Sequence, residues 1–174
     1  MTPSTTKQAL VPPPGQALVV FVRPTELLST DKLTLLTGNG HFLGDSLPAS
    51  HFASALPPGQ HLFVCWAEST GVVQATLLPN RVYYVEVVPL PGDASARCDL
   101  LALSPRSPKW SSLVGWLSQT RQLVPALGPG QSYISSRWTE AQARVRAAQD
   151  QLSRLTPAQL AERTLQPQDG AAAQ

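Results

Sequence analysis

The sequence predicts a mainly β protein, an antiparallel β-sandwich of about seven to eight strands with a covering helix and a helical C-terminal extension. Three observations support this fold class. Short apolar runs recur through residues 17–103 and are separated by Gly-, Pro- and Asn-containing turns, which is the pattern of all-β domains. An amphipathic helical pattern begins at Pro108. Helix-start signals then recur at Thr139 and Thr156.

The strand predictions depend on the spacing of apolar residues. Residues 17–23 and 61–67 are apolar on both faces, so we expect central strands that are covered on both sides. Residues 72–78 alternate instead, which directs Val73, Ala75 and Leu77 inward. Gly38-Asn39-Gly40 can supply the positive φ angles of a tight hairpin turn. We expect the other strands at residues 32–37, 41–43, 50–56, 81–88 and 97–103.

The chain divides into four parts. Pro12-Pro13-Pro14 cannot enter a helix interior or a central strand, so residues 1–15 are predicted to be a disordered lead-in. Residues 16–126 form the β-sandwich domain, whose helix places Trp110, Leu113, Val114, Leu117 and Val124 on one face and ends before Pro125. Residues 127–165 are a loop, to about residue 138, followed by the helical extension. Residues 166–174 are predicted to be disordered.

Composition excludes several classes of partner and leaves the compartment open. Only 14% of the residues are charged and the net charge is +2, with no basic cluster of the kind that binds nucleic acid. No apolar stretch reaches the length of a membrane span. The first residues lack a signal-peptide pattern, so we expect a soluble cytoplasmic protein with Cys65 and Cys98 as buried thiols. Envelope association by another export route stays open, and a Cys65–Cys98 disulfide would favour it.

Four segments together carry a family resemblance: VVFVRP (19–24), GHFLGDSL (40–47), PPGQHLFVCW (57–66) and LLPNRVYYVEVV (77–88). In this order they resemble a family of small bacterial β-sandwich domains of unknown function, similar to the modules found as extracytoplasmic appendages and lipoproteins. The resemblance covers residues 17–103 and implies the fold. It brings no catalytic residues, and this chain differs by its helical extension and by the missing lipoprotein signal.

No arrangement of side chains predicts catalysis, a cofactor or a metal. His41, His51 and His61 are ten residues apart, which matches the hairpin rhythm and lacks the spacing of metal ligands. His61 follows Pro-Gly and is expected to hydrogen-bond a turn. There is no nucleophile elbow and no phosphate-binding glycine loop. We therefore predict a protein that is not an enzyme, with no cofactor.

The helix predicted after Thr139 is the most suggestive element for function. Its apolar residues are spaced four, three, four and three residues apart, which is a heptad pattern and forms an apolar seam along one side of the helix. The seam covers only about two heptads. A helix this short is marginal alone in water, so another surface must bury the seam. The seam packs on the protein's own domain, or it binds a protein partner or a second copy. The candidate partner-binding residues are Ala141, Val145, Ala148, Leu152, Leu155 and, on the preceding helix, Trp116.

These expectations combine into one functional hypothesis. The chain is a non-catalytic protein-interaction or structural adaptor module of a bacterial assembly, with its C-terminal helix as the contact. A β-sandwich that binds a small ligand or a carbohydrate is the alternative, together with an enzyme whose site is assembled from scattered residues.

Overall fold

The computed structural model describes residues 1–3, 8–24 and 30–172 of the chain. The strands are β1 (Thr2–Pro3), β2 (Ala17–Arg23), β3 (Leu33–Thr37), β4 (Phe42–Ser46), β5 (Ser50–Leu56), β6 (Gly59–Trp66), β7 (Thr70–Leu77), β8 (Arg81–Leu90), β9 (Arg97–Leu103), β10 (Arg121–Val124), β11 (Thr164–Leu165) and β12 (Ala171–Ala172). The helices are η1 (Trp110–Ser112), α1 (Leu113–Gln119), α2 (Leu127–Ser136), α3 (Trp138–Ser153), α4 (Pro157–Glu162) and η2 (Pro167–Asp169).

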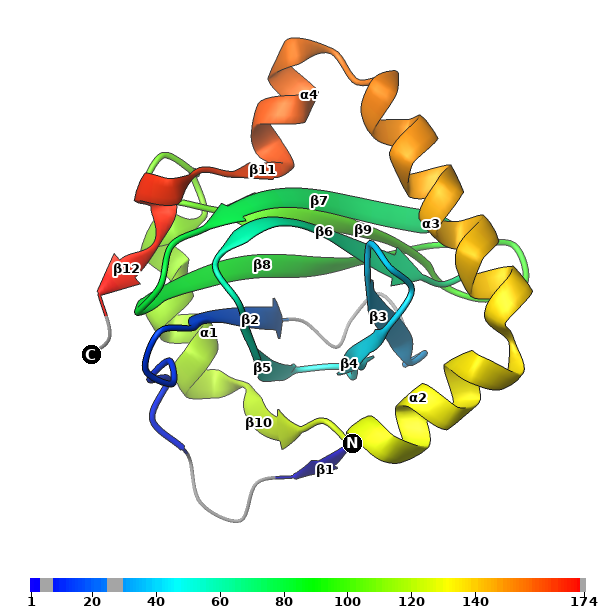
Figure 1. Cartoon of the computed structure of the whole chain (residues 1–174), viewed down its shortest axis with the longest axis horizontal. Helices are drawn as coiled ribbons and strands as arrows, with labels where there is room; N and C mark the ends of the chain where they lie inside the picture. Colours follow the sequence, from blue (N-terminus) through cyan, green and yellow to red (C-terminus); the bar gives the residue numbers. More distant parts are fainter. Residues whose placement is uncertain (4–7, 25–29, 173–174) are drawn as a thin grey trace.

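Two packed sheets form the body of the protein, and the helices lie outside them (Figure 1). Among the described residues the larger sheet has the order β1-β10-β5-β2-β8-β12, with β9 also pairing with β8, and the smaller sheet has the order β11-β7-β6-β3-β4. Every predicted strand is present, and the prediction of a mainly β protein with a few helices is confirmed.

The sheets are mixed, which corrects the expectation of purely antiparallel pairing. β2 runs parallel to β8, β10 parallel to β5, and β11 parallel to β7. The hairpin signals in the sequence predict only pairs that are adjacent along the chain. Along the chain, β2 and β8 are separated by β5 of their own sheet and by four strands of the smaller sheet, so their relative direction depends on how the chain crosses between the sheets.

The main core lies between the two sheets. Phe21 stacks on Phe52 with ring centroids 5.1 Å apart and meets Phe63 edge-on at 5.3 Å. All of β2 is buried, as expected for a run that is apolar on both faces. β6 is central in its sheet, between β7 and β3, but only Phe63, Val64 and Cys65 of this strand are fully buried. The inward residues predicted for β7 also belong to this core: Val73, Ala75 and Leu77.

A disulfide connects the two sheets. It joins Cys65 on β6 to Cys98 on β9, with Cα atoms 6.3 Å apart, a separation that a disulfide spans readily. The expectation of two free thiols is therefore wrong. That expectation came from the assumed reducing compartment, since the sequence does not show that strands 33 residues apart face each other across the core.

The predicted helix at 108–124 is shorter than expected, although it does cover a sheet. Leu113 packs with Val22 and Leu103 on the larger sheet, and Trp110 and Leu117 lie against this cluster. Val114, predicted on the same buried face, is 79% exposed. The helix ends because the Thr120 hydroxyl donates to the Trp116 carbonyl and its backbone turns extended. Residues 121–124 then pair with β5 and β1 as β10.

Residues 127–136, predicted as a loop, form α2. Gly128-Pro129-Gly130 is a sequence typical of turns. Pro129 lies in the first helical turn, where its missing N–H leaves no helical hydrogen bond unmade. Gly130 lies directly against the Phe42 ring, and a Cβ there would be 2.2 Å from two ring carbons. The helix therefore depends on contact with β4, which the sequence alone does not reveal.

Both ends of the chain contain ordered structure where disorder was predicted. Residues 2–3 pair with β10, and the Gln8 N–H donates to the Gln122 side chain at 2.6 Å. Residues 4–7 lie outside the described residues. At the other end β12 pairs with β8, and buried Asp169 accepts from the Gln166 N–H and pairs with Arg106 at 2.9 Å. Backbone pairing and a buried carboxylate stabilise segments that have little apolar content.

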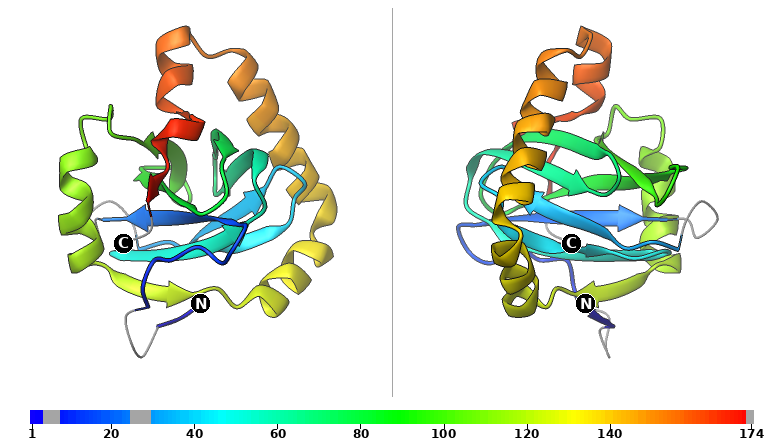
Figure 2. Two further views of the ribbon diagram at one scale, coloured as in Figure 1. Left: turned by 60° about the vertical axis from the view of Figure 1, so that its left-hand side comes forward. Right: turned by 90° about the vertical axis from the view of Figure 1, so that its right-hand side faces the viewer.

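The helices after β10 form an arch beside the two sheets. α2 lies near β4, α3 rises along the smaller sheet, and α4 leads back to β11 on β7 (Figures 1 and 2). The arch covers only part of the outer face of the smaller sheet. That partial cover positions the candidate site.

We predict that the disulfide stabilises the fold. Replacing Cys65 and Cys98 together by Ala should lower the free energy of unfolding by about 2–4 kcal/mol, because the crosslink restricts the unfolded chain. Urea denaturation of the oxidised protein and of the variant measures the difference. The oxidised protein should expose no reactive thiol after unfolding. Quantitative thiol labelling of unfolded wild-type protein at both cysteines would contradict the prediction.

The Glu68 carboxylate gives a second prediction. It accepts backbone hydrogen bonds from Asp93, Ala94 and Ser95, and these lower its pKa from 4.5 to about 2. A depressed pKa stabilises the fold above pH 4.5, and this contribution is lost as the pH falls toward 2. NMR titration of the carboxyl carbon should show the low pKa. Glu68→Gln should lose less stability than wild type over this range, and equal losses would contradict the prediction.

Candidate functional site

The outer face of the smaller sheet is covered by helix at one end and open at the other. At the covered end Leu36, Phe42, Val64 and Val72 form an apolar surface. α3 packs on β6 and β7 at this end. The small side chains of the α3 seam let the helix approach the strands closely. The seam residues buried in this cluster are Ala141, Val145 and Ala148, with Leu152 packed partly against it.

In this structure the α3 seam packs on the protein's own sheet. Ala141, Val145 and Ala148 face their own sheet and are at most 4% exposed, so they have no surface to offer a partner in this arrangement. Leu155 is half-buried and lies outside the cluster. Trp116 is half-buried on the larger sheet, against the Val22 cluster. The structure therefore does not bring the predicted partner-binding residues together on one exposed surface.

The junction of α2 and α3 instead presents exposed aromatic side chains. Tyr133 is 43% exposed and Trp138 is 44% exposed. The Arg137 guanidinium lies 4.9 Å from the centre of the Tyr133 ring, and Lys32 Nζ lies 5.4 Å from it. Both distances are within the range of cation–π attraction. We call these four residues the aromatic corner.

The β3–β4 hairpin holds Trp138 in place. Gly40 has φ +79°, a conformation that favours glycine, and a Cβ there would lie 3.4 Å from the Trp138 ring. The His41 ring lies 6.4 Å from that of Trp138. Gln142 on α3 donates to the Asn39 carbonyl at 3.4 Å. Because hairpin and helix are tied together, the indole is exposed and yet fixed in orientation.

The open end of the sheet contains a groove of about 560 Å³. Its floor is the outward side of β6 and β7, and its walls are the β3–β4 hairpin, α3 and the segment after α4. None of the described residues that line it is Asp, Glu, Lys or Arg, so we call it the neutral groove. The lining residues are Thr37, Gly38, Asn39, Gln60, His61, Leu62, Gln74, Ala75, Thr76, Gln149, Thr164 and Gln166.

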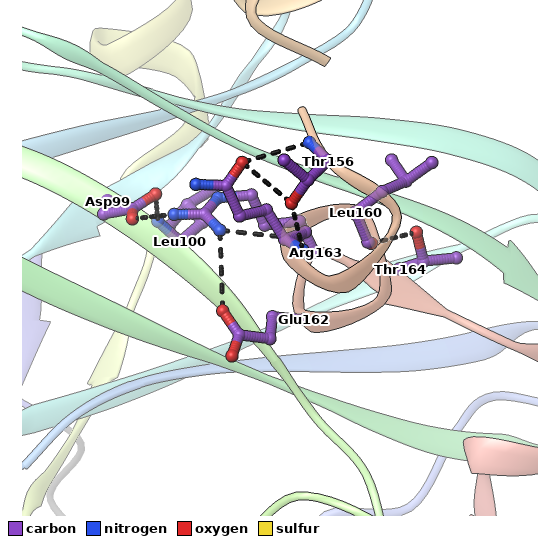
Figure 3. Close-up of polar contacts among 8 residues, drawn as sticks. Asp99, Leu100, Thr156, Leu160, Glu162, Arg163 and Thr164 are labelled. Carbon is purple, nitrogen blue, oxygen red and sulfur yellow. Dashed lines mark hydrogen bonds and ion pairs between the residues drawn. The ribbon is translucent and has the colours of Figure 1, made fainter. Parts of the chain in front are cut away.

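The wall after α4 is fixed by two sets of polar contacts (Figure 3). Thr156 and Gln159 form a capping box at the start of α4. At the other end of α4, Arg163 forms an ion pair with Asp99 of β9 while its carbonyl accepts from the Gln74 N–H at 2.9 Å. Thr164 donates to the Leu160 carbonyl at 2.7 Å. Arg163 thus connects the groove wall to both sheets.

The three histidines lie in different environments. His51 is buried, with Nδ1 2.7 Å from the Thr120 hydroxyl. His61 Nε2 lies 2.8 Å from the Pro57 carbonyl, which confirms the predicted hydrogen bond to a turn. His41 lies beside Trp138. Within residues 1–3, 8–24 and 30–172, no group of three His, Cys, Asp or Glu side chains is close enough to hold a metal ion.

Sequence reasoning placed Tyr133 and Trp138 in a loop and did not single them out. A usable signal was present, since two large aromatic residues in a polar, glycine-rich stretch are candidates for exposed contacts. The neutral groove had a weaker signal in the outward residues of the strands, Gln60, Gln74 and Thr76. Its walls come from segments distant in the sequence, so it could not be assembled from spacing.

Comparison of the chain with protein-family models, curated proteins and solved structures found no match. In the part of the chain that the structure describes, no helix has both the length and the apolar character needed to cross a membrane.

The packing of α3 gives a direct test. Val145→Asp should lower the free energy of unfolding by about 3 kcal/mol or more, because it places a carboxylate in an apolar contact. Ala147→Asp is the matched control, because Ala147 is exposed on the same helix, and it should change stability by less than about 0.5 kcal/mol. Chemical denaturation measures both. Equal stability of the two variants would mean that the seam is not packed on the sheet.

Proposed function

We propose that the protein is a non-catalytic protein-interaction module in which the two sheets, as a β-sandwich of the kind the sequence resembles, support a contact surface on the helical extension. The proposed surface is the aromatic corner, in place of the α3 seam that the sequence suggested. The partner is another protein, and the module acts as an adaptor by positioning it.

One observation carries this proposal: the Tyr133 and Trp138 side chains of the aromatic corner are exposed and are also held by neighbouring residues. Tyr, Trp and Arg are the residues most enriched among those that dominate binding energy in protein interfaces. Tyr133 is flanked by two cations, and Trp138 is held by the hairpin. Side chains that are already held lose little conformational entropy when a partner binds.

We further propose that the module works in an oxidising compartment, in association with the cell envelope. The disulfide between Cys65 and Cys98 supports this location, because such bonds persist outside the reducing cytoplasm. The resemblance to extracytoplasmic sandwich modules points the same way. A cytoplasmic location, the first expectation from the sequence, is the alternative.

The test compares binding by two exposed-site variants. Tyr133→Ala combined with Trp138→Ala should weaken binding of a partner at least about tenfold, because it removes both anchors. Val114→Ala is the control, since Val114 is also exposed but lies on α1, against the other sheet. In-cell crosslinking with each variant identifies proteins that depend on the corner, and titration calorimetry with the purified partner measures affinity. Unchanged crosslinking and affinity for the double variant would contradict the proposal.

A further inference from the structure

The neutral groove has a composition that distinguishes it from the rest of the surface. Among the described residues that line this groove, His61 is the one titratable side chain. Its lining contains five amide side chains and three threonine hydroxyls: Asn39, Gln60, Gln74, Gln149, Gln166, Thr37, Thr76 and Thr164. Amides and hydroxyls both donate and accept hydrogen bonds. A ligand that fits such a surface is uncharged and has many groups with the same dual capacity.

A second cavity shows the contrast within the same molecule. It measures about 730 Å³ and lies between β9, the loop that follows β9, and the segment after α4. Two of its charged side chains, Glu86 and Lys109, pair at 2.8 Å. Arg106, also in its lining, pairs with Asp169 at 2.9 Å. Those charges are compensated by ion pairs, whereas the described lining of the neutral groove carries no acidic side chain, lysine or arginine.

The Gln74 side chain is oriented by a hydrogen bond that leaves capacity for a ligand. Gln74 Nε2 donates to the Thr164 hydroxyl at 3.0 Å, and that hydroxyl donates onward to Leu160. The Gln74 amide therefore keeps its oxygen and one N–H available.

Other side chains at the groove are not engaged elsewhere. Among the described residues, Gln60 and Gln149 have no side-chain hydrogen-bond partner. Gln60 comes from β6 and Gln149 from α3, so they reach the groove from its floor and from one wall. Leu62, half-buried beside them, supplies an apolar contact.

From these features we infer that the neutral groove is a binding site for an uncharged carbohydrate. The volume falls in the range of small-molecule sites. Sugar hydroxyls both donate and accept, which matches the amides and threonines that line the groove. The site is separate from the aromatic corner, although the β3–β4 hairpin contributes to both, and it does not depend on the protein-interaction proposal.

The test is an NMR titration of the full chain with three neutral probes, namely chitotriose, cellotriose and maltotriose, up to millimolar concentrations. At least one should cause saturable shifts of the side-chain amide signals of Gln60, Gln74 and Gln149. Affinity for a neutral ligand should not change with salt, because no ion pair forms. An acidic oligosaccharide, trigalacturonate, and a neutral tripeptide, Gly-Ser-Gly, serve as comparison probes.

Variants locate the site. Gln60→Ala combined with Gln149→Ala should weaken carbohydrate binding about ten- to thirtyfold, the effect of losing hydrogen bonds from two side chains. Gln151→Ala, on α3 outside the lining, and the aromatic-corner double variant should bind as wild type. The inference is overturned if no neutral probe gives saturable shifts, if trigalacturonate or the tripeptide binds better, or if the double glutamine variant, with its amide spectrum otherwise unchanged, binds like wild type.

Discussion

The rest of the structure depends on one set of contacts, those that hold β6 and β7 of the smaller sheet against β9 of the larger sheet. The disulfide joins β6 to β9, and Ser69 both donates to the Cys98 carbonyl and accepts from its N–H. At Gly71 a Cβ would lie 2.7 Å from the Asp99 Cα, so the backbones meet where any side chain would separate them. Arg163 adds an ion pair to Asp99 on the outside. Each contact fixes the position of the smaller sheet.

These contacts also determine which surfaces the smaller sheet can present. Its inner face is occupied by the core, so function can use only the outer face and the elements beside it. α3 covers the apolar end of this face and leaves the end with Gln60, Gln74 and Thr76 open. The covered end stabilises the helix and thereby supports the aromatic corner at its start. The open end becomes a groove because α3 and the Arg163-anchored segment form its walls.

Both proposed sites share the β3–β4 hairpin. Gly40 supports Trp138 on one side, and Asn39 lines the groove on the other. The hydrogen bond from Gln142 to the Asn39 carbonyl ties the hairpin to α3. A partner at the aromatic corner and a carbohydrate in the groove would therefore both lie beside this hairpin. The two are nevertheless distinct in chemistry, because aromatic rings and cations form the first and neutral amides the second.

The sequence by itself determined the strands and their inward residues, because alternation and turn residues are local signals. It also located the covering helix, although it made that helix too long, since residues 121–124 pair as β10. It also identified the α3 seam by its spacing, but spacing does not say which surface buries a seam, and the chain's own sheet does so at Val145 and Ala148. Only the tertiary structure paired Cys65 with Cys98, ordered the segment around Asp169, and brought Gln60, Gln149 and Thr164 to one groove. Each of these depends on contacts between distant segments, which local patterns do not encode.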